Sequence, residues 1–419
     1  MIQPIALKQG SRTSFVKVGT HFASLNAVDL SKTLVNGMIE GLPFPQELIQ
    51  HVVWGMVVPD PNIYSIARET VLASKLDSGV EAYSVSRACA TSLQSVTNAA
   101  LLYNAYPKEK SVTLAGGVES FSAVKPVLTE EASAYFKKLT LRGSVPEKLA
   151  RMFRIPVSKM LPVPPSPTEY STGLTMGQHC ELMVKEFKIE RKRQDSLALR
   201  SHQGSVKARE HVAKMIVPIG SAKSDTLVRS DTTMDQLASL KPVFDRKGTG
   251  SLTAGNSSPF ADGAAALWVL SPAIGTEITP DAYLIDFEYV GYAPKEGLLM
   301  GPGKAMLRLL ERRGLKWKDL DYIEIHEAFA GQVLCNVDAV NDSAYRARKY
   351  GVDYDPGVLA EETINPWGSS LSYGHPFGAT GARMLNHAME YLKQHNKKLA
   401  LVTACTAGAL AGACLISRP

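Results

Sequence analysis

Two cysteines and two histidines stand where predicted secondary-structure elements begin or end. Cys89 follows a short β-like stretch and precedes an apolar helical run that extends to about Ala105. His375 precedes a second helical run, Cys405 ends a strand-like run, and His326 directly follows another. A thiol at the start of a helix feels the positive end of the peptide dipoles, which favours the thiolate near neutral pH. The four residues therefore predict a nucleophilic cysteine assisted by imidazole groups.

The neighbours of two of these residues suit that chemistry. His375 lies between Gly374 and Pro376, so its backbone is fixed while its ring stays free to act as a general base on a distant thiol. Small residues fill the turn 406–409 after Cys405, so backbone N–H groups there can approach a ligand. Taken alone, each residue also fits a plainer interpretation, because a lone cysteine before a helix is often a small buried hydrophobe and a turn histidine often only caps the turn.

An internal repeat organises the chain. Residues 34–54 and 307–325 each predict a helix, a short link and a strand. Residues 89–115 and 375–404 each predict a helix followed by a strand, and each segment begins with a candidate catalytic residue. Alternating strands and helices predict a largely parallel sheet in each half, with ligands at the carboxyl ends of the strands. We expect the halves to meet at one pocket and the first strand to begin near Phe15.

Several further segments accompany these four residues in a characteristic order: Ala115-Gly116-Gly117-Val118-Glu119-Ser120, Met176-Gly177, Arg200-Ser201-His202, Thr253-Ala254-Gly255-Asn256-Ser257-Ser258 and Asp262-Gly263-Ala264-Ala265-Ala266. Together they resemble the thiolase family over almost the whole chain. Within that family the chain is most similar to the branch of the trifunctional-enzyme β subunit. The resemblance implies an α/β thiolase fold, in which two duplicated βαβαβαββ halves form a layered α/β/α/β/α core with an inserted loop domain.

The repeat, the length and the resemblance together predict the domain boundaries. The N-terminal half comprises residues 1–122 and a returning segment, 250–272. A loop domain, 123–249, is inserted between these two parts. The C-terminal half covers residues 273–419.

The resemblance implies thiolytic cleavage of a 3-ketoacyl-CoA. His375 would deprotonate Cys89, which attacks the keto carbon and forms an acyl-enzyme, while Cys405 protonates the departing acetyl-CoA enolate. His326 and His375 would hold the enolate-like oxygen, and the backbone N–H groups of Cys89 and Ala407 would form the oxyanion hole. Coenzyme A, itself a substrate, would then take the acyl group with its proton removed by Cys405. No cofactor is expected.

The resemblance also assigns substrate contacts to Ser258, at the pantetheine arm, and to Met176 and Phe329.

The chain departs from the usual sequence of the family at several positions. Ala407 and Ala409 stand in a turn that is usually Gly-Gly-Gly, and alanine adopts a positive φ less easily than glycine. Ser369 replaces the second glycine of a Gly-Gly pair, and Ser92 replaces a glycine after the nucleophile. His326 replaces asparagine, which is typical of the trifunctional-type branch.

Three alternative functions stay open from the sequence. A biosynthetic acetoacetyl-CoA thiolase would use the same site in the opposite direction. A condensing enzyme like the ketoacyl synthases would use Cys89, His326 and His375 in similar roles, but it would not need Cys405. A non-catalytic acyl-CoA-binding paralogue would keep the fold without keeping the four reactive side chains.

The inserted region begins with a basic amphipathic stretch, 123–165, that holds eight basic and three acidic residues. Such a stretch can cover an acyl tunnel and meet coenzyme A phosphates, or it can contact an anionic membrane surface or a partner subunit. We therefore expect acyl-CoA and coenzyme A as ligands and a homodimer as the assembly. A hydratase/dehydrogenase α subunit and a peripheral membrane are possible partners.

Composition excludes several other classes of function. The net charge of +6 over 419 residues is modest, and no basic stripe with interleaved aromatic residues indicates nucleic acid. The five cysteines show no Cys-x-x-Cys spacing, so Cys180, Cys335 and Cys414 are expected to pack in the core and no metal is expected. We expect a reducing compartment, either the mitochondrial matrix or the bacterial cytoplasm, and no secretion.

Overall fold

The two halves of the chain build the same succession of strands and helices. The structure, a computed structural model, describes residues 2–141, 144, 146, 161–163, 168–274 and 277–419. The N-terminal half consists of β1 (Ile5–Thr13), α1 (Ala27–Glu40), β3 (Ile49–Gly55), α2 (Ile66–Ala73), β4 (Glu81–Val85), α3 (Thr91–Ala105), β5 (Val112–Glu119) and β7 (Ala261–Leu270). The C-terminal half repeats this order as β8 (Ala282–Gly291), α11 (Gly301–Arg313), β9 (Tyr322–Ile325), α12 (Ala330–Asn341), α15 (Thr380–Gln394), β10 (Leu399–Thr406) and β11 (Leu410–Ser417).

The strands join into one sheet in the order β4-β3-β5-β7-β1-β8-β11-β10-β9, and β1 pairs antiparallel with β8 where the halves meet. β3 runs parallel to β4 and β5, and β9 runs parallel to β10. The counterpart of β4 in the C-terminal half is reduced to a parallel bridge between Ile323 and Ile364. The prediction of a largely parallel sheet is therefore correct only for the outer strands.

The central strands pair antiparallel, for a physical reason that is clear in the C-terminal half. The three-residue turn from Ala407 to Ala409 joins β10 to β11, and so short a link permits only antiparallel neighbours. The prediction that the first strand begins near Phe15 is wrong, because β1 already spans Ile5–Thr13. The polar residues in the middle of β1 concealed its strand character, whereas Phe15 follows the strand as a buried core residue.

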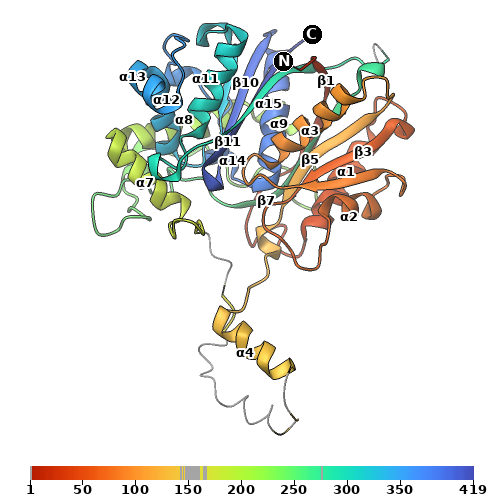
Figure 1. The fold of residues 1–419 in the computed structure, drawn as a ribbon, viewed down its shortest axis with the longest axis horizontal. Helices are drawn as coiled ribbons and strands as arrows, with labels where there is room; N and C mark the ends of the chain where they lie inside the picture. Colours follow the sequence, from red (N-terminus) through yellow and green to blue (C-terminus); the bar gives the residue numbers. More distant parts are fainter. Residues whose placement is uncertain (1, 142–143, 145, 147–160, 164–167, 275–276) are drawn as a thin grey trace.

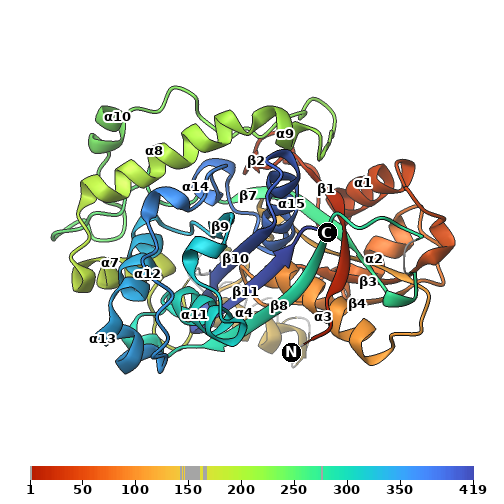
Figure 2. The same cartoon turned by 90° about the horizontal axis from the view of Figure 1, so that it is seen from above.

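The helices and strands of the two halves stack into five layers, which confirms the predicted α/β/α/β/α core (Figures 1 and 2). α3 and α15 lie side by side in the middle layer, where their apolar side chains pack with those of β5, β7 and β10. α1 and α2 cover the outer face of the N-terminal half. α11 and α12 cover the outer face of the C-terminal half. The middle layer brings the N-terminal ends of two helices from opposite halves together.

The region between β5 and β7 contains short strands and helices outside the repeat. Among the described residues they are α4 (Glu130–Leu141), α7 (Met176–Phe187), α8 (Arg191–Lys207), α9 (Arg209–Ala213), β6 (Ile216–Val217) and α10 (Met234–Ala238). The short elements elsewhere include β2 (Val16–Lys17), α13 (Ser343–Tyr345) and α14 (Ser370–Tyr373). α4 projects away from the layered body (Figure 1). Much of the basic stretch 123–165 lies outside the described residues. In the described part of the chain, no helix is long and apolar enough to cross a bilayer. The domain boundaries stay a prediction.

Candidate functional site

Cys89 lies in a tight turn between β4 and α3. The turn is closed by the side chain of Thr91, whose Oγ1 accepts from Arg87 N at 2.8 Å and donates to the Ala88 carbonyl at 2.7 Å. Ala88 takes a φ of +42°, so the backbone reverses direction sharply just before the cysteine. The hydroxyl of Thr91 thus stabilises an unusual backbone conformation that presents Cys89 at the start of α3.

The protein environment keeps the Cys89 thiol protonated. Desolvation by burial raises its pKa to about 12, and hydrogen bonds from the backbone of Ala407 and of Cys89 itself lower it only in part. The nearby Glu119 raises it slightly further. The expectation that the dipole of the helix favours the thiolate near neutral pH is therefore wrong for the free protein, because desolvation outweighs the helix terminus.

His326 directly follows β9, and its backbone N–H donates to the Thr403 carbonyl at 2.8 Å. Nδ1 of the ring lies 2.8 Å from the hydroxyl of Ser370, whereas Nε2 is buried and has no hydrogen-bond partner. Burial and the positive charge of Arg383 lower the pKa of His326 to about 3. The ring is therefore neutral at physiological pH.

His375 occupies the turn before α15. Gly374 has a φ of +88°, a conformation that suits glycine, and the backbone N–H of His375 donates to the Pro259 carbonyl at 2.9 Å. Nδ1 lies 2.7 Å from the Thr380 hydroxyl, and Nε2 is buried without a partner. Burial, the neighbouring His326 and Arg383 hold the pKa of His375 well below its usual value.

The structure brings three of the predicted residues into one cluster. The sulfur of Cys89 and one ring nitrogen each of His326 and His375 lie within 4.8 Å of one another. The two imidazole centroids are 4.2 Å apart. Such a set of ligand atoms could hold a metal ion, although the same sulfur and nitrogens are the groups that the predicted reaction needs free. The prediction that no metal takes part stays a prediction.

Cys405 lies next to the last residue of β10 and is buried beside this cluster. Burial raises the pKa of Cys405 well above its usual value, and the interaction with Cys89 raises it further. The other cysteines, Cys180, Cys335 and Cys414, are buried and free, which agrees with the expected packing role.

The positions that differ from the usual family sequence have local backbone conformations and hydrogen bonds that accommodate them. Positive φ angles fall at Gly408 and Ala409, not at Ala407, so Ala407 contributes its N–H without a strained backbone. The Gly408 N–H donates to Glu169 at 2.7 Å, which ties the turn to the loop domain. The Ser92 hydroxyl accepts from the N–H of Ala382 at 2.8 Å and joins the beginnings of α3 and α15.

Two of the three predicted substrate contacts, Ser258 and Phe329, lie on or against the segment that begins at His326. The backbone N–H of Ser258 donates to the Ala328 carbonyl at 2.9 Å, within the segment that begins at His326. Phe329 packs edge to face against Phe244 with centroids 5.7 Å apart, and Met176 contacts the same apolar core. Their roles toward a ligand stay predictions.

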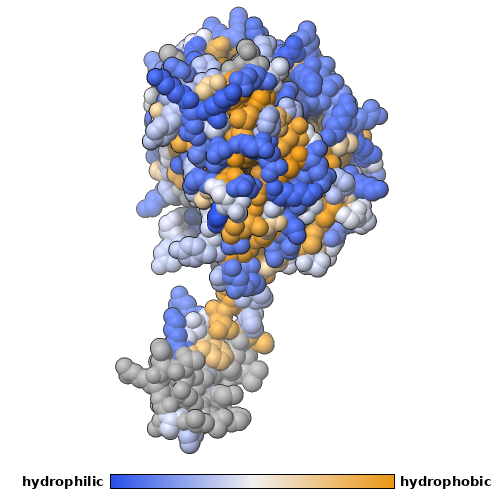
Figure 3. Space-filling model, turned by 90° about the vertical axis from the view of Figure 1, so that its right-hand side faces the viewer, coloured by the Kyte–Doolittle hydropathy of each residue, from blue (hydrophilic) through white to orange (hydrophobic). Residues whose placement is uncertain are grey.

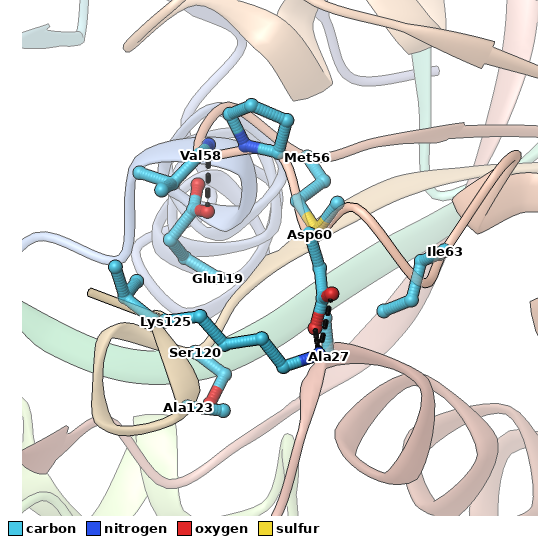
Figure 4. A pocket seen from close by; sticks show the side chains of 11 residues that line it. Ala27, Met56, Val58, Asp60, Ile63, Glu119, Ser120, Ala123 and Lys125 are labelled. Carbon is cyan, nitrogen blue, oxygen red and sulfur yellow. Dashed lines mark hydrogen bonds and ion pairs between the residues drawn. The ribbon is translucent and has the colours of Figure 1, made fainter. Parts of the chain in front are cut away.

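Sequence reasoning missed Glu119, a buried carboxylate at the end of β5. It accepts backbone N–H groups from Val57, Val58 and Gly378 at 3.0 to 3.2 Å, so it links the loop after β3 to the turn of His375. Burial raises the pKa of Glu119 to about 7. Figure 4 shows Glu119 in a small pocket beside the ion pair of Lys125 and Asp60. An acidic residue within an otherwise apolar, glycine-rich strand was the available signal.

The fold and this cysteine and histidine centre define an acyl-transfer type of α/β enzyme, and comparisons with known proteins give its family. The thiolase N-terminal domain matches residues 5–273 and the thiolase C-terminal domain matches residues 278–418. The chain is 38% identical to a 3-ketoacyl-CoA thiolase of Pseudoalteromonas translucida and 36% identical to one of Photobacterium profundum. These alignments cover 98% of this chain and 95% and 96% of those proteins. The chain therefore belongs to the thiolase family.

Solved structures agree with this assignment. The Bacillus anthracis acetyl-CoA acetyltransferase superposes with a TM-score of 0.84 at 25% identity, covering 100% of this chain and 99% of that one. The human mitochondrial 3-ketoacyl-CoA thiolase, in its complex with CoA, gives a TM-score of 0.82 at 25% identity, with coverage of 100% and 98%.

Proposed function

We propose that this protein is a 3-ketoacyl-CoA thiolase that cleaves its substrate with coenzyme A into acetyl-CoA and a shortened acyl-CoA. In the first half-reaction, Nε2 of His375 takes the thiol proton of Cys89, and the sulfur attacks the 3-keto carbon. The bond between C2 and C3 then breaks, and C2 of the departing acetyl-CoA enolate takes the proton of Cys405. The products of this step are acetyl-CoA and an acyl thioester on Cys89.

The second half-reaction restores the enzyme. The Cys405 thiolate removes the thiol proton of coenzyme A, whose sulfur attacks the acyl carbon. The Cys89 thiolate leaves and recovers its proton from His375. The N–H groups of Cys89 and Ala407 stabilise the oxyanion on the carbon attached to Cys89. His326 stabilises the enolate oxygen.

One observation supports the proposal above all others. The chain places the Cys89 thiol and one nitrogen of each of two imidazoles within 4.8 Å of one another, with the second thiol beside them. Nε2 of each of these rings is buried without a hydrogen-bond partner. All four groups are neutral in the resting site, which suits a reaction that moves protons between them rather than one that starts from a stable ion pair. A condensing enzyme would have no use for the fourth group, Cys405.

The test follows the loss of 3-ketoacyl-CoA absorbance after addition of coenzyme A, over substrates of increasing chain length. Wild-type protein is expected to turn over, whereas Cys89→Ala and Cys405→Ala are each expected to lose at least about a thousandfold in kcat. Cys414→Ala, which alters a buried cysteine in the neighbouring strand β11, provides the matched control. Equal turnover by wild type and both active-site variants would refute the mechanism.

We also propose a homodimer that associates through the free edge of β4. β4 is the terminal strand of the sheet, so one side of its backbone has no strand partner among the described residues. Exposed apolar side chains accompany this edge, including Leu72 of α2, Tyr83 of β4 and Leu101 of α3. Figure 3 shows apolar residues on this side of the molecule. Light scattering coupled to gel filtration should give twice the chain mass, and Tyr83→Lys should lower it.

We propose two further partners for the stretch 123–165. One is an α subunit with hydratase and dehydrogenase activities, and the other is an anionic membrane. The proposed compartment is a mitochondrial matrix or a bacterial cytoplasm. The proposal rests on the excess of basic residues in this stretch. Co-sedimentation with anionic liposomes should fall after deletion of residues 137–155. Unchanged co-sedimentation would remove the membrane proposal.

A further inference from the structure

The two active-site imidazoles occupy similar positions but have different partners behind them. Nε2 of His326 and Nε2 of His375 are both buried and unpartnered, and both rings lie against the Cys89 sulfur. Each Nδ1 is held by a hydroxyl, from Ser370 and Thr380 respectively. In a neutral ring one nitrogen carries the hydrogen and the other a lone pair. The direction of each hydroxyl hydrogen bond therefore determines what Nε2 offers to the substrate.

Behind Ser370 lies a fully buried ionic network. Arg383 and Glu324 form an ion pair with no exposed side-chain surface. The Nη2 of Arg383 lies 3.2 Å from the Ser369 hydroxyl and 3.4 Å from the Ser370 hydroxyl. Glu324 accepts from the Ser369 hydroxyl and from Tyr322, each at 2.7 Å. A charged pair as deeply buried as this requires such additional hydrogen bonds to be stable.

The network gives the Ser370 hydroxyl a direction. A guanidinium group has donors only, and its positive charge attracts the lone pair of the Ser370 oxygen and repels the hydroxyl hydrogen. The hydrogen therefore points away from Arg383 and toward Nδ1 of His326, 2.8 Å away. Because Nδ1 then accepts, the hydrogen of the neutral His326 ring is on Nε2.

We propose that Ser370, oriented by Arg383, is a positioning residue that holds His326 in the tautomer with its hydrogen on Nε2. His326 is then a fixed hydrogen-bond donor toward the substrate oxygen. It is not the base of the proposed mechanism, a role that belongs to His375. This inference rests on the proposed thiolase function. It adds that the two imidazole rings have different roles toward the substrate.

The surroundings of His375 give the opposite arrangement. In the proposed mechanism His375 is a base, which requires the Thr380 hydroxyl to turn its hydrogen toward the Pro376 carbonyl, a group that only accepts and lies 3.5 Å away. The Thr380 oxygen then accepts from Nδ1–H of His375, which leaves a lone pair on Nε2. One ring therefore donates a hydrogen bond to the substrate and the other accepts the proton of Cys89.

The same network explains why serine stands where the family usually has the second glycine of a pair. Ser369 donates to Glu324 and accepts from Arg383, so it holds the guanidinium against Ser370. A glycine at this position would leave Arg383 with fewer acceptors, and the direction of the Ser370 hydroxyl would be less strictly fixed.

A double-mutant cycle with a spectroscopic readout tests the inference. Ser370→Ala should lower kcat by about 10- to 100-fold at similar KM, the size of effect known for residues that orient metal-bound histidines, and Ser370→Thr should recover most of the loss. In a His326→Asn background, whose amide donates without a tautomer, Ser370→Ala should have no further effect. Nitrogen-15 NMR of labelled histidine, assigned by difference from His326→Asn, should show the hydrogen on Nε2 of His326.

A wild-type His326 with its hydrogen on Nδ1 would overturn the inference while leaving the thiolase proposal intact. An equal effect of Ser370→Ala in both backgrounds would do the same, because the loss would then be structural. Failure of the proposed function shows differently, as no turnover of 3-ketoacyl-CoA by the wild-type protein.

Discussion

At the residue scale, the site is built from groups that burial keeps uncharged. The pKa of Cys89 is raised to about 12 and that of His326 is lowered to about 3, and in both cases desolvation is the largest cause. His375 is shifted in the same direction as His326. The resting site therefore contains a thiol and a neutral imidazole, so the proton moves only when substrate supplies an electrophile and oxyanion donors stabilise the product.

This resting state predicts the pH dependence of Cys89 alkylation. Because only the thiolate reacts and its population is small throughout, the rate with iodoacetamide should rise about tenfold per pH unit between pH 7 and 9. Mass spectrometry of the modified peptide measures the rate, Cys89→Ser provides the control, and saturating acyl-CoA should protect the residue. A rate that levels off below pH 8 would show a stable thiolate paired with imidazolium and contradict this account.

At the element scale, catalysis depends on how closely the turns at the ends of the strands approach one another. Glu119 at the end of β5 accepts from Gly378, three residues after His375, and from two residues in the loop after β3. The backbone of Gly378 lies directly against the neighbouring strands: a Cβ built on it would lie 2.5 Å from the Val118 carbonyl oxygen and 3.0 Å from that of Gly55. No flexible side chain is available there to move aside.

Gly378→Ala is therefore expected to displace the His375 turn. Overpacking of this kind costs about 1 to 3 kcal/mol, so the free energy of unfolding should fall by that amount and kcat should fall with it. Urea unfolding and the thiolysis assay measure the two effects. Gly41→Ala, at an exposed helix end where an added Cβ meets nothing within 4 Å, is the matched control. Wild-type kcat in Gly378→Ala would show that the approach of this turn does not position His375.

The positions of residues relative to the ends of helices and strands explain what the sequence could and could not predict. Cys89, His326, His375 and Cys405 were found because each stands at the end of an element, and in a duplicated α/β chain such ends converge. The network of Arg383 was not found, because its contacts join residues that are 13 to 59 positions apart and no local pattern encodes them. The direction of the thiol pKa was also missed, since the helix terminus is visible in the sequence whereas desolvation requires the packed structure.

At the scale of the whole molecule, the burial of neutral histidines makes stability depend on pH. Burial lowers the pKa of His202 to about 4 and of His326 to about 3, and it holds those of His375 and His387 well below their usual value. When the chain unfolds in acid, each ring regains its ordinary pKa and binds a proton. The unfolded state then binds more protons than the folded state, so stability falls as pH drops below about 6.5.

His387 allows this effect to be measured outside the active site. It lies on α15 in the interior, both of its ring nitrogens lack partners, and Trp367 and Tyr373 pack against it edge to face. Each pH unit below the unfolded pKa, down to the folded pKa, costs the wild type about 1.4 kcal/mol through this one residue. His387→Phe removes that cost, so its unfolding free energy should fall less steeply than that of the wild type between pH 6.5 and 5.

Urea unfolding at equal protein concentration and at pH 7, 6 and 5 measures the difference between the two slopes. His21→Gln, which alters an exposed histidine, should follow the wild type. Comparing slopes removes any constant effect of fitting the phenylalanine ring into the interior, because that effect is the same at every pH. If wild type and His387→Phe lost stability in parallel, His387 would bind its proton over the same pH range in the folded and the unfolded chain, which would contradict a lowered pKa in the folded protein.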